Sequence, residues 1–266
     1  MLLSSEHTDL SPAAFVEKCG EVFAVFGAGT QASGNVSYGV RVGSERFFVK
    51  TAGVPDCGRP FLSHGERVRL LHNAVRLLRT VFDPAFPALR NALESPLGPL
   101  LVYEWIDGEL LGATRARRAD PDSAFARFRR LPAAEIVAAL DVVFRLHVRL
   151  AASGWIACDY YDGCLLYDFE RRRLRVIDLD HYRPGPFVNE IGRMFGSTRF
   201  MAPEEHELGA RIDERTTVFA MGRTIEQLFP AASARVAKLA SHACEPERER
   251  RPQTLEAFYA AWCDAV

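Results

Sequence analysis

The stretch IACDYYDGCLLYDFERRRLRVIDLD, residues 156–180, carries the strongest fold signal of this chain. Asp159 lies between two β-like runs, where a loop would expose its carboxylate. Asp178 and Asp180 directly follow the apolar run LRVI, and two residues in extended chain point to the same side, so both carboxylates can bind one hard cation. The stretch therefore predicts a carboxylate-bearing loop followed by a carboxylate-bearing strand end.

The residues around this stretch predict a mixture of strands and helices. Three runs rich in β-branched and aromatic residues, separated by glycines and a Gly43-Ser44 turn, predict an antiparallel meander over 21–26, 35–42 and 45–50. Apolar residues at three-and-four spacing predict a helix over 64–82. A buried strand over 100–105, a long helix over 133–152 and a short helix between Ser11-Pro12 and Gly20 complete the prediction.

Composition narrows the class of protein. With 266 residues, 48% of them hydrophobic, the chain can bury a core in one large domain or two packed lobes. Its 33 Lys and Arg against 34 Asp and Glu remove the electrostatic case for a nucleic-acid binder. No apolar run reaches membrane length and the start lacks a secretory signal, so we expect a cytoplasmic protein without a membrane partner. Six cysteines without a CxxC pair indicate neither a disulfide framework nor a zinc site.

Two features point to phosphate chemistry. Gly27, Gly29 and Gly34 between two strands would let backbone N–H groups approach a phosphate, although turn glycines of a flexible hairpin are the commoner explanation of such a pattern. Lys50 is one of only three lysines among 33 cationic residues, which suggests a need for a compact point charge. Glu66 could pair with Lys50, or take part in an incidental surface pair.

The order of these features along the chain resembles the protein kinase family. A glycine-rich hairpin, Lys50 on a strand and Glu66 on a helix precede Asp159 and Asp178, and the segment GSTRFMAPEE at 196–205 contains the AlaProGlu triplet typical of that family. The resemblance spans about residues 21 to 260. It implies an α+β, bilobal fold: an N-terminal helical extension over 1–20, a small β-sheet lobe over 21–105 and a larger helical lobe over 106–266.

The resemblance also implies ATP and Mg²⁺ as cofactors and assigns roles to residues. Lys50 would bind the α- and β-phosphates, Asp178 would bind Mg²⁺, and Asp159 would orient the acceptor hydroxyl as catalytic base. The nucleotide would be bound by Gly27, Gly29, Gly34, Val36, Lys50, Glu66, the backbone of Glu104 and Ile106, and Leu166. Asp180, and more doubtfully Asp162 and Cys164, would be further metal ligands. Glu204 and Arg251 would form a buried ion pair with a structural role.

Several positions depart from the family pattern and keep three functions open. Tyr161 replaces a lysine near the γ-phosphate, Cys164 replaces an asparagine that binds metal, and Thr217 replaces an aspartate that anchors the Asp159 loop. Together with the bulky Phe48 they favour a pseudokinase or nucleotide-gated binding module. The main prediction is still an ATP-dependent, Ser/Thr protein-kinase-like phosphotransferase acting on a protein substrate, with Ser197 in the acceptor-facing segment, and the pseudokinase is its alternative. A small-molecule kinase, favoured by the two acids at 178 and 180, is the second alternative.

Overall fold

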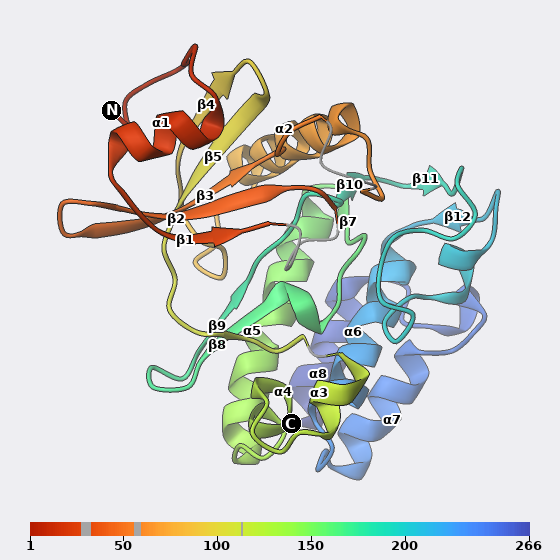
Figure 1. The fold of residues 1–266 in the computed structure, drawn as a ribbon. Helices are drawn as coiled ribbons and strands as arrows, with labels where there is room; N and C mark the ends of the chain where they lie inside the picture. The colour runs from red at the N-terminus through yellow and green to blue at the C-terminus, as the bar shows by residue number, and fades with distance from the viewer. Residues whose placement is uncertain (28–32, 56–59, 113) are drawn as a thin grey trace. The chain divides into compact units, whose positions relative to one another are not determined.

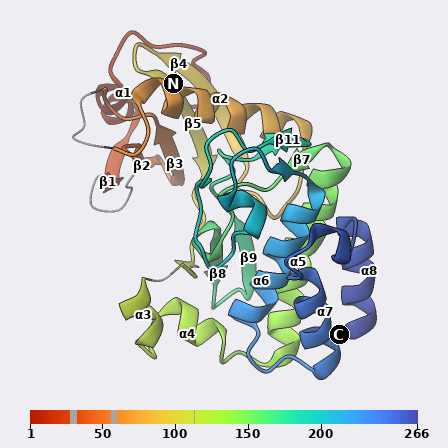
Figure 2. The same ribbon diagram turned by 90° about the vertical axis from the view of Figure 1, so that its right-hand side faces the viewer.

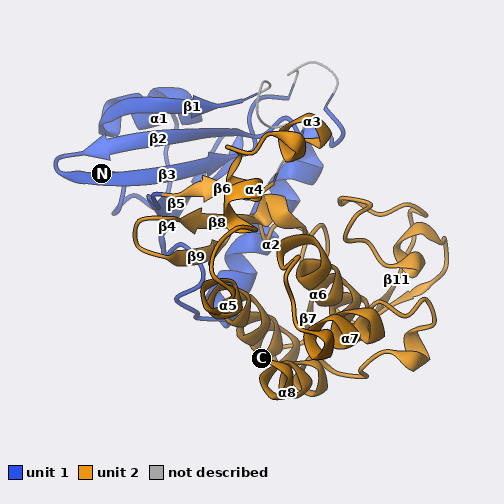
Figure 3. Cartoon of the chain, turned by 90° about the horizontal axis from the view of Figure 1, so that it is seen from below, with its two compact units in different colours: residues 1–107 blue, residues 108–266 orange. Residues whose placement is uncertain are grey.

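The computed structural model describes residues 1–27, 33–55, 60–112 and 114–266. The fold is mixed α+β, as the sequence predicts. The chain forms two compact units, Met1–Asp107 and Gly108–Val266, which Figure 3 shows in two colours. In the described part of the chain, no helix is long and apolar enough to cross a membrane.

A five-stranded antiparallel sheet forms the centre of the first unit (Figure 1). Its strands, in spatial order, are β1 (Glu21–Phe26), β2 (Val36–Val42), β3 (Glu45–Thr51), β5 (Gly98–Glu104) and β4 (Leu89–Ser95). The three-strand meander and β5 match the prediction within two residues at each end, whereas β4 was not expected.

One face of this sheet packs against the N-terminal residues. Helix α1 (Pro12–Cys19) begins at the N-cap Ser11, whose side chain accepts from the N–H of Ala14, and Gly20 ends it, as predicted. Leu2 and two residues of α1 share a core with alternate strand residues: Leu2, Phe15, Val16, Val40, Phe47, Val49, Leu93, Leu100 and Val102. The first 20 residues are therefore part of the first unit and its core.

The opposite face packs against α2 (His64–Thr80), through a core of Ala52, Leu71, Ala74, Val75 and Leu101. Lys50 pairs with Leu101 across β3 and β5, and directly opposed residues point to the same face. Its side chain therefore lies on the α2 face of the sheet. Arg67 of α2 is fully buried and donates to four backbone carbonyls, those of Ala52, Val54 and Leu62 at 2.7–2.8 Å and that of Ser33 at 3.4 Å.

Helices dominate the second unit (Figure 2). The largest are α5 (Ala133–Ala152), α6 (Glu214–Leu228), α7 (Ala234–Ala243) and α8 (Leu255–Ala265), which pack side by side. Phe144 of α5 makes edge-to-face ring contacts with Phe258 and Trp262 of α8, which joins the two helices. The predicted helix 133–152 is confirmed at both ends.

Short elements of the second unit contain residues 156–180, the stretch with Asp159, Asp178 and Asp180. A three-stranded sheet contains β6 (Glu109–Leu110), β8 (Leu165–Asp168) and β9 (Arg173–Val176). Two further pairs are β7 (Trp155–Ile156) with β10 (Arg183–Pro184), and β11 (Phe187–Val188) with β12 (Arg211–Ile212). The remaining elements are α3 (Arg115–Ala119), α4 (Ala124–Phe128), η1 (Asp162–Cys164), η2 (Pro203–His206) and η3 (Arg248–Arg250). Asp159 lies between β7 and η1, and Asp178 follows β9.

Candidate functional site

The Asp159 loop is anchored from helix α6. Thr217 is buried, and its hydroxyl accepts a hydrogen bond of 3.1 Å from the N–H of Ala157, two residues before Asp159. The replacement of an aspartate by Thr217 was expected to remove this anchor. Since a hydroxyl oxygen is itself an acceptor, the loop keeps one hydrogen bond to the helix.

Asp159 and Asp178 both adopt a backbone conformation that is costly for residues other than glycine. Among the described residues, three non-glycine residues have positive φ: Asp159 at 56°, Asp178 at 62° and Arg172 at 51°. Arg172 belongs to the tight turn between β8 and β9, where such values are common. The two aspartates lie outside hairpin turns, at a loop and at a strand end. Left-handed backbone costs about 1–2 kcal/mol at such residues, and this strain concentrates at functional sites.

Tyr161 lies close enough to both aspartates for their charges to affect the pKa of its phenol. Burial raises the pKa of its phenol, and the nearby Cys164, Asp159 and Asp178 raise that pKa further. The ring packs on Gly163, where a Cβ would lie only 2.2 Å from a ring carbon. The phenol is therefore neutral at physiological pH and adds no positive charge to the group of carboxylates.

Two of the four predicted metal ligands have other partners. Asp162 is fully buried, and both of its carboxylate oxygens accept hydrogen bonds of 2.7 Å from Arg199. The thiol of Cys164 donates to the carbonyl oxygen of Asp159 at 3.4 Å. The hydrogen bonds of Asp162 and Cys164 stabilise the loop itself. Asp178 and the buried Asp180 are the other two candidate metal ligands.

No group of three or more His, Cys, Asp or Glu side chains within the described ranges is placed to hold a metal ion alone. Mg²⁺ in nucleotide sites commonly takes one or two carboxylates and completes its octahedron with phosphate oxygens and water. Asp178 and Asp180 fit that kind of donor set by their chemistry.

The segment 196–205 packs against Asp159. At Gly196, with φ of 138°, a Cβ would lie 3.7 Å from the Cα of Asp159. The carbonyl of Ser197 accepts from the N–H groups of Phe200 and Met201, which turns the segment back on itself. The Arg199–Asp162 pair then ties the turn to the Asp159 loop.

His181 lies next to the same carboxylate. Its Nε2 is 3.6 Å from Oδ2 of Asp159, and its ring packs on that of Phe195. Sequence reasoning did not single out His181, because no spacing rule relates it to a residue 22 positions earlier.

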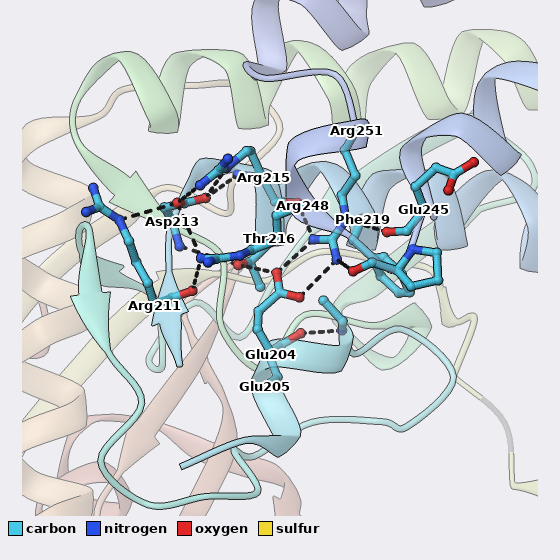
Figure 4. Close-up of polar contacts among 12 residues, drawn as sticks. Glu204, Glu205, Arg211, Asp213, Arg215, Thr216, Phe219, Glu245, Arg248 and Arg251 are labelled. Carbon is cyan, nitrogen blue, oxygen red and sulfur yellow. Dashed lines mark hydrogen bonds and ion pairs between the residues drawn. The ribbon is translucent and has the colours of Figure 1, made fainter. Parts of the chain in front are cut away.

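Glu204 and Arg251 form the buried ion pair that was expected (Figure 4). The guanidinium donates to both carboxylate oxygens of Glu204, at 2.7 and 2.9 Å, and to the carbonyls of Arg215, Glu245 and Pro246. The hydroxyl of Thr216 donates to Glu204 as well, at 2.8 Å. Since every donor has a partner, this pair fixes η2, at the end of segment 196–205, to α6 and to the residues before α8.

The predicted phosphate-binding residues of the first unit lie on or beside its sheet. Lys50 of β3 is 9% exposed, which makes it a buried cation. Val36 begins β2, and Gly34, with φ of 88°, precedes it; the carbonyl of Gly34 lies 2.3 Å from where a Cβ of Gly53 would be. Gly27 directly follows β1. Gly29 lies outside the described residues.

The expected Lys50–Glu66 ion pair is not formed among the described residues. Glu66 is the third residue of α2, and its carboxylate accepts from both the N–H and the hydroxyl of Ser63, at 2.8 and 2.6 Å, in a capping box. These hydrogen bonds lower the pKa of Glu66. Arg67 provides the link from α2 to β3 instead, through its hydrogen bond to the carbonyl of Ala52.

The residues predicted to hold the adenine lie in both units. The N–H of Glu104 donates to the carbonyl of Ala88, so this backbone group is already used within the first unit. Ile106 follows two residues later, in the segment after β5. Leu166 lies on β8 and is half-buried, with its Cγ 3.1 Å from where a Cβ of Gly108 would be.

Comparison with protein-family models and with curated proteins found no match to this chain.

Proposed function

We propose that this chain is an ATP-dependent phosphotransferase with a bilobal, protein-kinase-like fold. It transfers the γ-phosphate to a Ser/Thr-type hydroxyl on a protein substrate. In this proposal the two compact units correspond to the small and large lobes.

The backbone of Asp159 and Asp178 is the observation that carries the proposal. A chain that holds two aspartates in left-handed conformation, outside tight turns, must offset that strain elsewhere. It does so for Asp159 by anchoring the loop through Thr217 and by packing Gly196 against it. Backbone strain that fixes the orientation of two carboxylates is expected where each carboxylate has a separate chemical task.

The residues present fit Mg²⁺ and a triphosphate. ATP supplies the phosphoryl group, and the metal neutralises the charge that develops on its oxygens. Asp178 and Asp180 are hard oxygen donors suited to Mg²⁺. Lys50 is suited to the phosphates, because a lysine ammonium is a compact point charge.

Asp159 would orient the acceptor hydroxyl and take its proton, so that the oxygen attacks the γ-phosphorus as the bond to the β-phosphate breaks. His181, at 3.6 Å, would limit the rotation of the Asp159 carboxylate. The segment 196–205 supports a protein acceptor, because it packs on Asp159 and its end is fixed by the Glu204–Arg251 pair.

The test is a radiolabel-transfer assay on purified protein with Mg-ATP and a panel of protein and small-molecule acceptors. Asp178→Asn should lose Mg²⁺-dependent transfer, with Asp122→Asn, at an exposed position, as its matched control. Lys50→Met should lose transfer, whereas Lys238→Met, at an exposed helical position, should not. Unchanged turnover in Asp178→Asn would refute the metal role, and transfer to a metabolite alone would refute the protein acceptor.

A nucleotide-gated binding module is the second candidate, and Cys164 and Tyr161 favour it. Both occupy the catalytic loop without supplying a metal ligand or a positive charge. A thermal-shift titration with ATP, with and without Mg²⁺, separates the candidates when combined with the transfer assay. Stabilisation by ATP without any transfer would support the binding module.

A further inference from the structure

A small pocket lies beside Asp159 within the second unit. Its walls are mostly apolar, and two carboxyl-bearing residues, Asp159 and Glu205, line it together with the rings of Tyr160, Phe195 and Phe200. The pocket leaves about 10 Å³ for the centre of a water molecule, which is the room that one water needs.

Glu205 is a buried acid whose carboxyl group has a hydrogen bond at one of its two oxygens. The residue is 5% exposed, and its Oε2 accepts a 2.7 Å hydrogen bond from the N–H of Ala202. Among the described residues no hydrogen bond to its Oε1 is found, and this oxygen is not one of the fully buried atoms without a partner, so a water molecule can reach it. A polar occupant of the pocket could hydrogen-bond to this oxygen and would be stabilised there.

The groups around Glu205 favour its neutral form. The pKa of Glu205 is raised to about 8, chiefly by burial and also by the neighbouring Glu204 and Asp159, against a lowering by the Ala202 N–H and by Arg251. The buried Cys158 thiol also faces this carboxyl, and burial raises the pKa of that thiol. At neutral pH the carboxyl therefore carries a proton and has an O–H to donate.

We propose that the pocket binds one water molecule that accepts a hydrogen bond from protonated Glu205 and donates one to the carboxylate of Asp159. Glu205 is then a positioning residue, which acts through the water to hold Asp159 in one orientation. No covalent bond forms or breaks, and the proton stays on Glu205. The inference rests on the proposed function only in giving Asp159 a catalytic task.

This arrangement predicts an alkaline limit. Above about pH 8, Glu205 ionises, loses its donor and faces Asp159 as a second anion. The two carboxylates then repel each other across the pocket, and Asp159 loses its fixed orientation. His181, whose Nε2 lies 3.6 Å from Oδ2 of Asp159, is a further titratable side chain next to that carboxylate.

The experiment follows the carboxyl carbon of Asp159 by NMR from pH 5 to 10 in protein with ¹³C-labelled aspartate. In the wild type, the Asp159 resonance should show a step near pH 8, when Glu205 ionises. Glu205→Gln keeps a donor and cannot ionise, so this step should vanish. Glu207→Gln, a change at an exposed position two residues further along the chain, should keep it. Absence of the step in the wild type, or its persistence in Glu205→Gln, would overturn the proposal.

The phosphotransfer rate provides a second readout. The wild-type rate should fall about 10-fold above pH 8, the rate of Glu205→Gln should stay level, and Glu205→Met, without a donor, should be about 10-fold slower at every pH. If Glu205→Met fails to fold, the NMR comparison with Glu205→Gln still decides. An NMR step in a protein without any transferase activity would leave the water-bridged pair intact and refute only the proposed function.

Discussion

Replacing Arg251 by Met tests whether the Glu204–Arg251 pair holds segment 196–205 in place. The guanidinium is fully buried and donates five hydrogen bonds, two to the Glu204 carboxylate and three to backbone carbonyls. Met preserves much of the side-chain volume but leaves a buried carboxylate with the hydroxyl of Thr216 as its remaining side-chain donor. Removing one partner of a buried pair costs about 3–5 kcal/mol, mostly because the other charge stays buried.

Urea unfolding, followed by fluorescence and circular dichroism, measures this cost. Arg250→Met is the matched control, because Arg250 is an exposed neighbour whose ion pairs with Glu245 and Glu247 are 3.6 and 3.8 Å long. That control should change the free energy of unfolding by less than about 0.5 kcal/mol. Adding Glu204→Leu to Arg251→Met should recover part of the loss. A loss below about 1 kcal/mol in Arg251→Met, with an unchanged m-value, would refute the reasoning.

Three further predictions follow from buried contacts. The pKa of Glu205 is raised from 4.5 to about 8 in the folded state, so folding keeps a proton that the unfolded chain loses. The contribution of Glu205 to the free energy of unfolding is therefore complete below pH 4.5 and falls by about 5 kcal/mol by pH 8. Urea titrations at several pH values should show this slope in the wild type and not in Glu205→Gln. Thr217→Val should cost about 1–3 kcal/mol and deprotect the amide of Ala157 in hydrogen exchange, whereas Thr217→Ser should not. Gly163→Ala should cost about 1–3 kcal/mol through its clash with the Tyr161 ring; a thermal melt of Gly163→Ala with Tyr161→Ala that shows no relief would contradict this cause.

The elements that the sequence predicts well carry their own local signals. Ser11 and Gly20 mark the ends of α1, and apolar periodicity marks α5. Strand β4 was missed because its sequence, LRNALES, contains no β-branched or aromatic residue. It is a strand because it pairs with β5, and such tertiary pairing overrides weak local propensity.

The residues of the candidate site also differ in whether the sequence carries a signal for their contacts. The Glu204–Arg251 pair was predicted by resemblance, across 47 positions of sequence. Ser63 and Glu66 form an S-x-x-E capping box, which is a local helix-start signal, and this reading explains Glu66 better than a pair with Lys50. The Asp162–Arg199 pair had no such signal, because its partners are 37 residues apart and either could have faced solvent.

The hydrogen bond from Arg67 to Ala52 has a mechanical consequence for Lys50. The guanidinium joins α2 to the chain two residues beyond Lys50, and it reaches the carbonyls of Val54 and Leu62 at the same time. We therefore expect a shift of α2 along the sheet to move the end of β3, and the ammonium of Lys50 to move with it. A lysine at position 67 carries all of its donors on one nitrogen, which cannot reach carbonyls that Arg67 binds through three separate nitrogens.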